Sequence, residues 1–351
     1  MLSYVSTFIS PRISPWIPFF GLAYPYLLFI NIIFTVVWIR YKKWRFLFSL
    51  IAILLGWNHL AAFFQLNLNK ESEENYREKF SVLPYNVRLF DLYNWSNNKS
   101  TKAKIFDFLE AEKPDIMCFQ EFYYDETKNF VTLESIKEFE HVNYYHAEYT
   151  FEVNSVYHFG IATFSKYPII NRGSMSFQNT NNICIYSDIV FGEDTIRIYN
   201  NHLQSVRLQP ENYNYLDSLK FFNENERMTG MIDIYKRFKE AYVKRAFQVE
   251  VISEHIKQSP YPVIVCGDFN DSPFSYTYRR MRSNLEDAFI EAGNGFGNTY
   301  ARRFPSFRID YLLHDEKFEC VNYEKYNVYY SDHFPIKGEF IVNNKKIITK
   351  D

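Results

Sequence analysis

The sequence predicts an α/β domain over residues 80–345, preceded by a hairpin of two transmembrane helices. Short apolar runs of strand length recur through the larger part of the chain, and turn residues separate them. Helical periodicity fits best over residues 101–112 and 238–257. The first 64 residues instead hold two long runs without a charged side chain. Without an internal repeat, one α/β domain behind a membrane region is the simplest interpretation.

The uncharged runs at the amino terminus cover residues 16–39 and 46–64, and each is long enough for a membrane-spanning helix of about 20 residues. A cleavable signal peptide is the first alternative, but it would have a shorter apolar stretch and a small-residue cleavage site. A pair of buried core helices is the second, but such helices carry a polar face. The runs contain only isolated polar residues such as Asn31 and His59. The sequence therefore predicts a membrane region over residues 1–64.

The loop between the two runs is basic, with four Lys or Arg and no acid over residues 40–45. Because short basic loops stay on the cytoplasmic side, the turn of the hairpin is expected there. A charged linker follows over residues 65–79. Two spans would then place the large domain outside the cytoplasm. The expected localisation is an integral protein of the cytoplasmic (inner) membrane with an extracytoplasmic domain.

Charge and cysteine content argue against two classes of protein: non-specific nucleic-acid binders with a basic surface, and zinc fingers. The first 64 residues contain five basic and no acidic side chains, so the remainder of a chain with formal net charge −2 is clearly acidic. Such a field repels polyanions and argues against non-specific nucleic-acid binding, although not against a nuclease that uses metal ions. The four cysteines are far apart and show no zinc-finger spacing. Cys118 and Cys266 lie inside apolar runs and are expected to be core thiols.

Acid, amide and imidazole groups occur where apolar strands end. The stretch "VIVCGDFND" finishes a buried strand with Asp268 and Asn270. Taken alone, it could be a simple turn, since Asp, Asn and Gly favour turns. The pattern recurs, however, in "LPYNVRLF", "DIMCFQE", "IRIYNNHL", "FRIDYLL" and "YYSDHFPI", which contain Asn86, Glu121, His202, Asp310, Asp332 and His333. Burying several unpaired carboxylates is costly, and a hard cation with oxygen ligands is an efficient partner.

Each of these residues also has a structural explanation. Asn86 could be a satisfied core amide, Glu121 a surface or helix-capping acid, and His202 a residue at an exposed strand end. Asp310 could form a buried salt bridge to Arg308 or Arg303. The joint pattern is stronger than any single member.

The motifs "YNVRLF", "FQE", "GIATFSKYPI", "NNHLQS", "GDFNDSP", "RIDYLL" and "SDHFPI", in this order, resemble the endonuclease/exonuclease/phosphatase (DNase I-like) superfamily. The preceding hairpin is similar to its membrane-anchored bacterial members. The resemblance implies two packed β-sheets flanked by helices, a four-layer sandwich. It also implies a phosphoester hydrolase whose relatives include nucleases, sphingomyelinases and inositol-phosphate phosphatases. One departure is Pro84, which would remove a hydrogen-bond donor from a strand interior.

The same resemblance implies a divalent cation held mainly by Glu121, with Asn86 beside it and Asp332 on the same side. Oxygen ligands without a cysteine cluster favour Mg²⁺, or Mn²⁺, over Zn²⁺.

The resemblance also implies the roles of the remaining residues. Asp268 would orient or deprotonate the attacking water, and Asn270 would contact the phosphoryl group. His333 would act on the phosphate or the nucleophile, with Asp310 fixing its tautomer. His202 would donate to a phosphate oxygen.

The expected function is therefore a membrane-anchored, metal-dependent phosphoester hydrolase in which water attacks phosphorus. Its substrate is either nucleic acid or a lipid or inositol-phosphate headgroup, and the acidic domain and the hairpin tilt slightly toward the second. A non-catalytic, membrane-anchored binding domain is a third interpretation. No protein partner is inferred. The aromatic and charged segment over residues 206–240 could grip nucleic acid, contact lipid or simply cover a sheet edge.

Overall fold

The computed structural model describes residues 2–67, 79–208, 212, 224–301 and 307–342. Its contacts divide the chain into two compact units. Unit one contains Met1–Trp57, Leu203–Val251 and Phe274–Met281. Unit two contains Asn58–His202, Ile252–Pro273 and Arg282–Asp351, and it holds every strand of the two large sheets.

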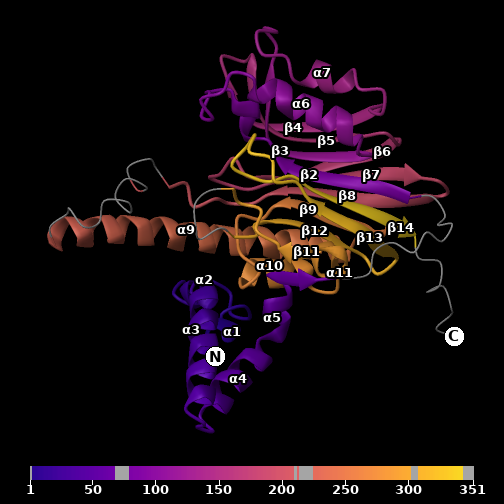
Figure 1. The fold of residues 1–351 in the computed structure, drawn as a ribbon. Helices are drawn as coiled ribbons and strands as arrows, with labels where there is room; N and C mark the ends of the chain where they lie inside the picture. Colours follow the sequence, from indigo (N-terminus) through magenta and orange to yellow (C-terminus); the bar gives the residue numbers. More distant parts are fainter. Residues whose placement is uncertain (1, 68–78, 209–211, 213–223, 302–306, 343–351) are drawn as a thin grey trace. The chain divides into compact units, whose positions relative to one another are not determined.

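Unit two contains two mixed six-stranded sheets (Figure 1). The first sheet has the order β10-β12-β9-β8-β7-β6, with bounds Glu286–Asp287, Asp310–His314, Val263–Asp268, Asp194–His202, Ile183–Phe191 and Ile169–Ser176. The second has the order β13-β14-β2-β3-β5-β4, with bounds Phe318–Lys325, Ile336–Val342, Lys79–Asn86, Ile116–Asp125, Tyr157–Ser165 and Tyr144–Val153. One pair in each sheet is parallel, β8 with β9 and β2 with β3. A small separate sheet pairs β1 (Phe64–Leu66) with β11 (Asn294–Phe296).

Alternation along β2, and along β3 as far as Phe119, builds the core between the two sheets. In β2 and β3 the even-numbered residues, such as Val82 and Cys118, join a buried cluster with residues of the first sheet. The odd-numbered residues, such as Leu83 and Phe119, pack on the other face with α6. Since side chains on a strand point to opposite faces in turn, each central strand contributes to two hydrophobic layers.

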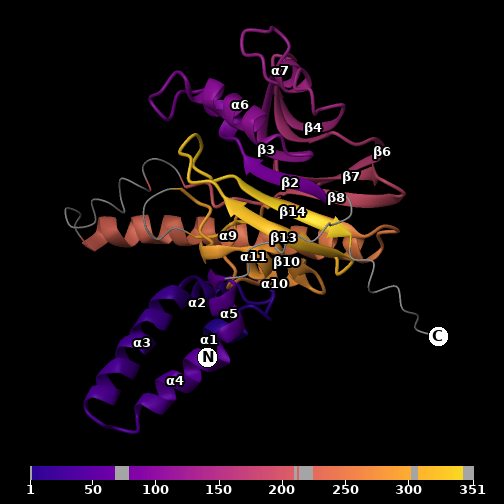
Figure 2. The same ribbon diagram turned by 45° about the vertical axis from the view of Figure 1, so that its right-hand side comes forward.

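Helices cover the outer faces of the sheets. The second sheet is covered by α6 (Thr101–Glu112) and α7 (Leu133–Lys137), which share a hydrophobic cluster with β2, β3 and β5 (Figure 2). On the outer face of the first sheet, Tyr199 bonds to His255 Nδ1 at 2.8 Å, near the end of α9 (Glu224–Lys257). A short helix, α11 (Ala288–Ala292), packs against β13. The predicted α/β fold of two sheets flanked by helices is confirmed.

Unit one is helical. It contains α1 (Leu2–Val5), α2 (Pro18–Leu22), α3 (Tyr24–Arg40) and α4 (Phe46–Leu55), together with most of α9 and of α10 (Tyr276–Arg282). Phe19 packs against the α9 residues Tyr235, Phe238 and Tyr242. The α9 residue Glu250 accepts hydrogen bonds from Arg12, Ser10 and Tyr276. Helices α3 and α4 contact each other and expose many apolar side chains.

The prediction of two transmembrane helices is wrong. Within the described residues, no helix is long and apolar enough to cross a membrane. The first uncharged run breaks between α2 and α3 at Ala23, so that α3 has 17 residues. The second breaks at Gly56, which ends the 10-residue α4 before the short α5 (Trp57–Ala61). The expected integral membrane localisation, and the extracytoplasmic placement derived from it, are therefore contradicted.

Pro84 does not disturb the sheet. The amide of Val87 donates to Gln120 of β3, so the odd-numbered amides of β2 face β3 and position 84 faces the β14 side. The pairing with β14 ends at Val82. The missing donor of Pro84 therefore costs no ladder hydrogen bond.

A buried ion pair in unit two leads to a stability prediction. Arg308 donates two hydrogen bonds to Asp287, at 2.9 and 2.6 Å, and the Arg308 and Asp287 side chains are 1% and 0% exposed. Asp287 also accepts from the amide of Phe289 and so caps α11. Asp287→Ala leaves a buried guanidinium without its counter-charge, and we expect it to lower the free energy of unfolding by about 3–5 kcal/mol.

Urea unfolding followed by circular dichroism would measure this loss. Asp194→Ala, at an exposed position, is the matched control and should change stability by no more than about 0.5 kcal/mol. Adding Arg308→Met to Asp287→Ala should recover much of the loss, because the buried charge is then gone. Equal stabilities of Asp287→Ala and Asp194→Ala would contradict the prediction.

Candidate active site

The candidate site begins where the inward-facing positions of the strands change from apolar to polar. The even-numbered positions that supply Ile198, Cys266 and Leu312 to the core continue as His202 on β8, Asp268 on β9 and Asp310 on β12. The strand register aligns Asp268 with both His202 and Asp310. From the second sheet, β2 ends at the buried Asn86 and contributes it to the same place.

Glu121 reaches the site through an irregularity in β3. The pairing of β3 with β5 shifts between Phe119 and Phe122, so two residues of β3 lie opposite one residue of β5. This is a β-bulge, and Glu121 within it has a positive φ of 51°. A regular strand would send Glu121, as an odd-numbered residue, to the outer face with Phe119. The bulge turns it toward the inner end of the sandwich instead.

Asp268 is the centre of the hydrogen-bond network. Its carboxylate accepts from Asn86 Nδ2 at 3.1 Å, and from the backbone N and Nδ2 of Asn270 at 2.8 and 3.0 Å. The preceding Gly267 has a φ of 114°, and a Cβ there would lie 2.2 Å from the backbone oxygen of Asn201. Only glycine allows this close approach between β8 and β9. The Gly-Asp sequence at the end of β9 is thus explained by geometry.

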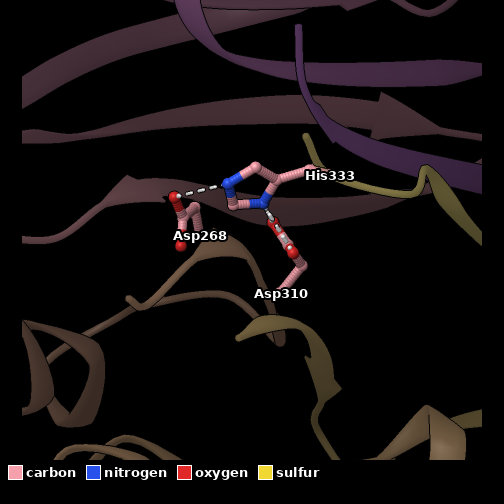
Figure 3. A group of neighbouring side chains, drawn as sticks. All are labelled: Asp268, Asp310 and His333. Carbon is pink, nitrogen blue, oxygen red and sulfur yellow. Dashed lines mark hydrogen bonds and ion pairs between the residues drawn. The ribbon is translucent and has the colours of Figure 1, made fainter. Parts of the chain in front are cut away.

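His333 lies between two carboxylates (Figure 3). Its Nδ1 is 2.9 and 3.1 Å from the oxygens of Asp310, and its Nε2 is 3.8 Å from Asp268 Oδ2. All three residues are buried, and one ligand-type atom of each lies within 4.8 Å of the others. The backbone of this loop is held by Ser331, whose hydroxyl donates to the carbonyl oxygen of Asn86 and accepts from the amide of His333. The imidazole is therefore fixed in orientation, with Nε2 toward Asp268.

The charges of this trio favour a protonated His333. Burial alone lowers the pKa of His333, but the negative charges of Asp310 and Asp268 outweigh burial and raise it. Burial raises the pKa of Asp268, an effect that the charge of His333 partly offsets. A buried carboxylate with a raised pKa beside a positively charged imidazole is an arrangement typical of acid–base catalysis.

The other side of the site is acidic. Asn86 Nδ2 lies 3.3 Å from Glu121 Oε1, and His202 Nε2 lies 3.9 Å from both Glu121 and Asp268. The Glu121 side chain is 37% exposed, so it is only partly withdrawn from water. The resulting desolvation, and then the charge of Asp332, raise the pKa of Glu121. Carboxylate and amide groups gathered in this way suit a hard divalent cation.

The structure thus brings all eight residues selected from the sequence to one end of the sandwich. The proposed salt bridge between Asp310 and Arg308 does not form, because Arg308 is paired with Asp287. Arg303, the other partner considered for Asp310, lies outside the described residues.

Sequence reasoning missed two residues of the site. Ser331 fixes the loop of His333, and Arg88 Nε lies 3.5 Å from Asp332 Oδ2. Arg88 lies two residues after Asn86 in the motif "YNVRLF", and this was a usable signal, because the resemblance implies a phosphate site at which a cation is expected. Ser331 begins the motif "SDHFPI", but Ser is also an ordinary turn residue, and the sequence assigned it no role in the site.

Comparisons with known proteins agree with this geometry. A family model described as the endonuclease/exonuclease/phosphatase family matches residues 85–333. A second model, described as a domain of unknown function, matches residues 1–63. No curated protein matches the chain.

Among solved structures, an endonuclease/exonuclease/phosphatase from Beutenbergia cavernae matches with a TM-score of 0.56 at 14% identity, over 76% of this chain and 72% of that one. A humanized TDP2 from D. rerio matches with a TM-score of 0.53 at 15% identity, over 75% and 98%. The catalytic domain of human Nocturnin matches with a TM-score of 0.50 at 17% identity, over 76% and 94%. At these identities the likeness establishes the fold alone.

Proposed function

Because the chain belongs to the endonuclease/exonuclease/phosphatase family, we propose that it is a divalent-metal-dependent phosphoester hydrolase in which water attacks phosphorus. The observation that carries the proposal is the buried chain of hydrogen bonds and ion pairs from Asp310 through His333 to Asp268 and Asn86. A buried carboxylate whose pKa is raised, beside an imidazole held by a second carboxylate, is a combination that clusters at functional sites.

The residues of this chain divide the chemistry between them. Asp268 orients the attacking water and accepts its proton, while Asn270 and His202 face the phosphoryl oxygens. His333 carries positive charge toward the developing negative charge, and Asp310 holds its Nδ1 proton so that Nε2 remains directed at the reacting group. Preorganised donors of this kind are typical of phosphoryl transfer, where stabilising charge is the main task.

The donor set on the other side of the site fits a hard cation. Glu121 and Asp332 are close enough for the charge of Asp332 to raise the pKa of Glu121, and a bound divalent cation would offset this repulsion. Glu121, Asn86 and Asp332 would hold it, and their oxygen atoms favour Mg²⁺ or Mn²⁺. When bound, the cation would neutralise charge on the phosphoryl oxygens. A second group of possible ligand atoms belongs to Asp268, Asp310 and His333. Here Asp310 is already hydrogen-bonded to Nδ1 of His333, so this group is less suited to hold the cation.

Two substrate classes fit this chemistry: nucleic acid, which would make the protein a nuclease, and lipid or inositol-phosphate headgroups. Part of the sequence argument for lipid or inositol-phosphate headgroups rested on a transmembrane hairpin, and none of the described helices is long and apolar enough to span a membrane. A panel of plasmid DNA, RNA, abasic duplex, sphingomyelin and inositol phosphates, each with Mg²⁺ and with chelator, would test the proposal. We expect metal-dependent turnover of at least one member. No turnover of any member would favour the non-catalytic binding domain.

A further inference from the structure

The segment that follows Asn86 has an unusual backbone. Four consecutive residues, Arg88 to Asp91 in the short helix η1 (Arg88–Asp91), have φ values of 46°, 53°, 53° and 60°. The left-handed conformation costs roughly 1–2 kcal/mol per residue for side chains other than glycine. Such strain persists only where the surrounding structure enforces it, and it concentrates at functional sites.

Three sets of contacts enforce this turn. Phe90 is fully buried and packs against the rings of Phe106, Phe119 and Phe122. The amide of Arg88 donates to Asn86 Oδ1 at 3.1 Å, which ties the turn to the site. Asp91 accepts from the amide and the hydroxyl of Ser96, which closes the loop that follows. The loop between Asp91 and Ser96 is therefore held in place at both ends.

This closed loop presents two aromatic side chains to solvent. Tyr93 is 61% and Trp95 is 43% exposed, and their ring centroids lie 5.0 Å apart in an edge-to-face pair with an interplanar angle of 63°. The guanidinium of Arg88 lies over the Trp95 ring, 4.4 Å from its centroid, and its Nε is 3.5 Å from Asp332. A single arginine therefore links the exposed aromatic pair to a residue of the catalytic site.

We propose that Tyr93 and Trp95 form a platform for the base of a nucleotide whose phosphodiester lies at the catalytic site, with the base stacked on one ring and bordered by the other. The inference rests on the proposed function and extends it by naming nucleic acid as the substrate class. Arg88 lies between the platform and the site, where its charge faces the substrate phosphate. Base stacking on exposed aromatic side chains is sequence-tolerant and is typical of proteins that bind single strands.

The position of Arg88 also argues against a choline headgroup. Aromatic rings recognise quaternary ammonium groups through cation–π contacts. Here a guanidinium already occupies one face of Trp95, and its positive charge repels a second cation close by. A nucleobase is a neutral aromatic ring and is not repelled by the guanidinium. The charges on this surface therefore favour a nucleobase over a choline headgroup.

Three p-nitrophenyl phosphodiesters test the proposal, because they share a leaving group and differ only in the second esterified alcohol: thymidine, methanol or choline. We expect kcat/KM for the thymidine ester to exceed that for the methyl ester by about tenfold. Trp95→Ala and Tyr93→Ala should each bring this ratio toward one, and Trp95→Phe should retain it. Phe151→Ala removes an exposed ring from β4 and should leave the ratio unchanged.

Binding measured by calorimetry separates the platform from catalysis. The wild-type protein should bind thymidine 5′-monophosphate about tenfold more tightly than 2-deoxyribose 5-phosphate, and Trp95→Ala should remove the difference. Loss of turnover with all three esters, with this binding preference intact, would refute the hydrolase function and not the platform. Equal affinities, a ratio unaffected by Trp95→Ala, or a preference for the choline ester would overturn the platform.

Discussion

Asp268→Asn is expected to lower kcat by roughly a hundredfold or more while the protein remains folded. The carboxylate of Asp268 receives hydrogen bonds from Asn86 and Asn270 and faces Nε2 of His333. Asparagine keeps the shape but cannot accept a proton from water. Because burial raises the pKa of Asp268, the negative charge is unfavourable in this position, and its loss should not destabilise the fold.

Steady-state rates on a verified substrate, with thermal unfolding as the folding check, would measure this effect. Asn270→Ala and His333→Ala should show losses of similar size, since both act on the reacting groups. Asp310→Asn should lose less, because Asp310 contacts only His333 within the trio and acts by orienting it. Asp194→Asn is the exposed control. Wild-type rates in the Asp268, Asn270 and His333 variants together would show that this cluster is not the active site.

The sequence contained enough information for the sandwich and for most of the site. Side chains alternate between the two faces of a strand, so every second residue shares a face. Polar residues at the ends of the inward-facing rows of neighbouring strands must therefore lie close together. Asn86, His202, Asp268 and Asp310 follow this rule. Glu121 does not, because its position depends on a bulge that the alternating pattern cannot show. The pattern of acids at strand ends selected Glu121, and resemblance to a family implied its role as the main metal ligand.

Two other features could not be predicted for different physical reasons. The apolar runs at the amino terminus are long enough, but a transmembrane helix also needs an unbroken backbone. The first run breaks at Ala23, where Pro25 lies in the first turn of α3, and the second ends α4 at Gly56; neither residue would have to break a helix in a membrane. The left-handed turn at Arg88 is maintained by the burial of Phe90 among distant residues. Non-glycine residues of this turn give no local signal for positive φ.

Removal of divalent cations is expected to abolish activity, and Mg²⁺ or Mn²⁺ is expected to restore it. The reason is the acidic side of the site, where the carboxyl groups of Glu121 and Asp332 repel each other and Asn86 adds an amide. Activity would be followed during titration with chelator and then with each metal. Mg²⁺ should also raise the unfolding temperature, since a ligand that binds only the folded state stabilises it. Full activity in excess chelator would refute the metal requirement.

Glu121→Gln decides which residues hold the cation. If Glu121 is the main ligand, this variant should need at least about tenfold more Mg²⁺ for half-maximal activity and should show a smaller thermal shift with Mg²⁺. Glu319→Gln, at an exposed position on β13, is the matched control. Asp268→Asn should behave in the opposite way, with low activity that no Mg²⁺ concentration rescues, because it lacks the proton acceptor and keeps the metal ligands. If Mg²⁺ instead rescued Asp268→Asn and not Glu121→Gln, the cation would belong to the cluster of Asp268, Asp310 and His333.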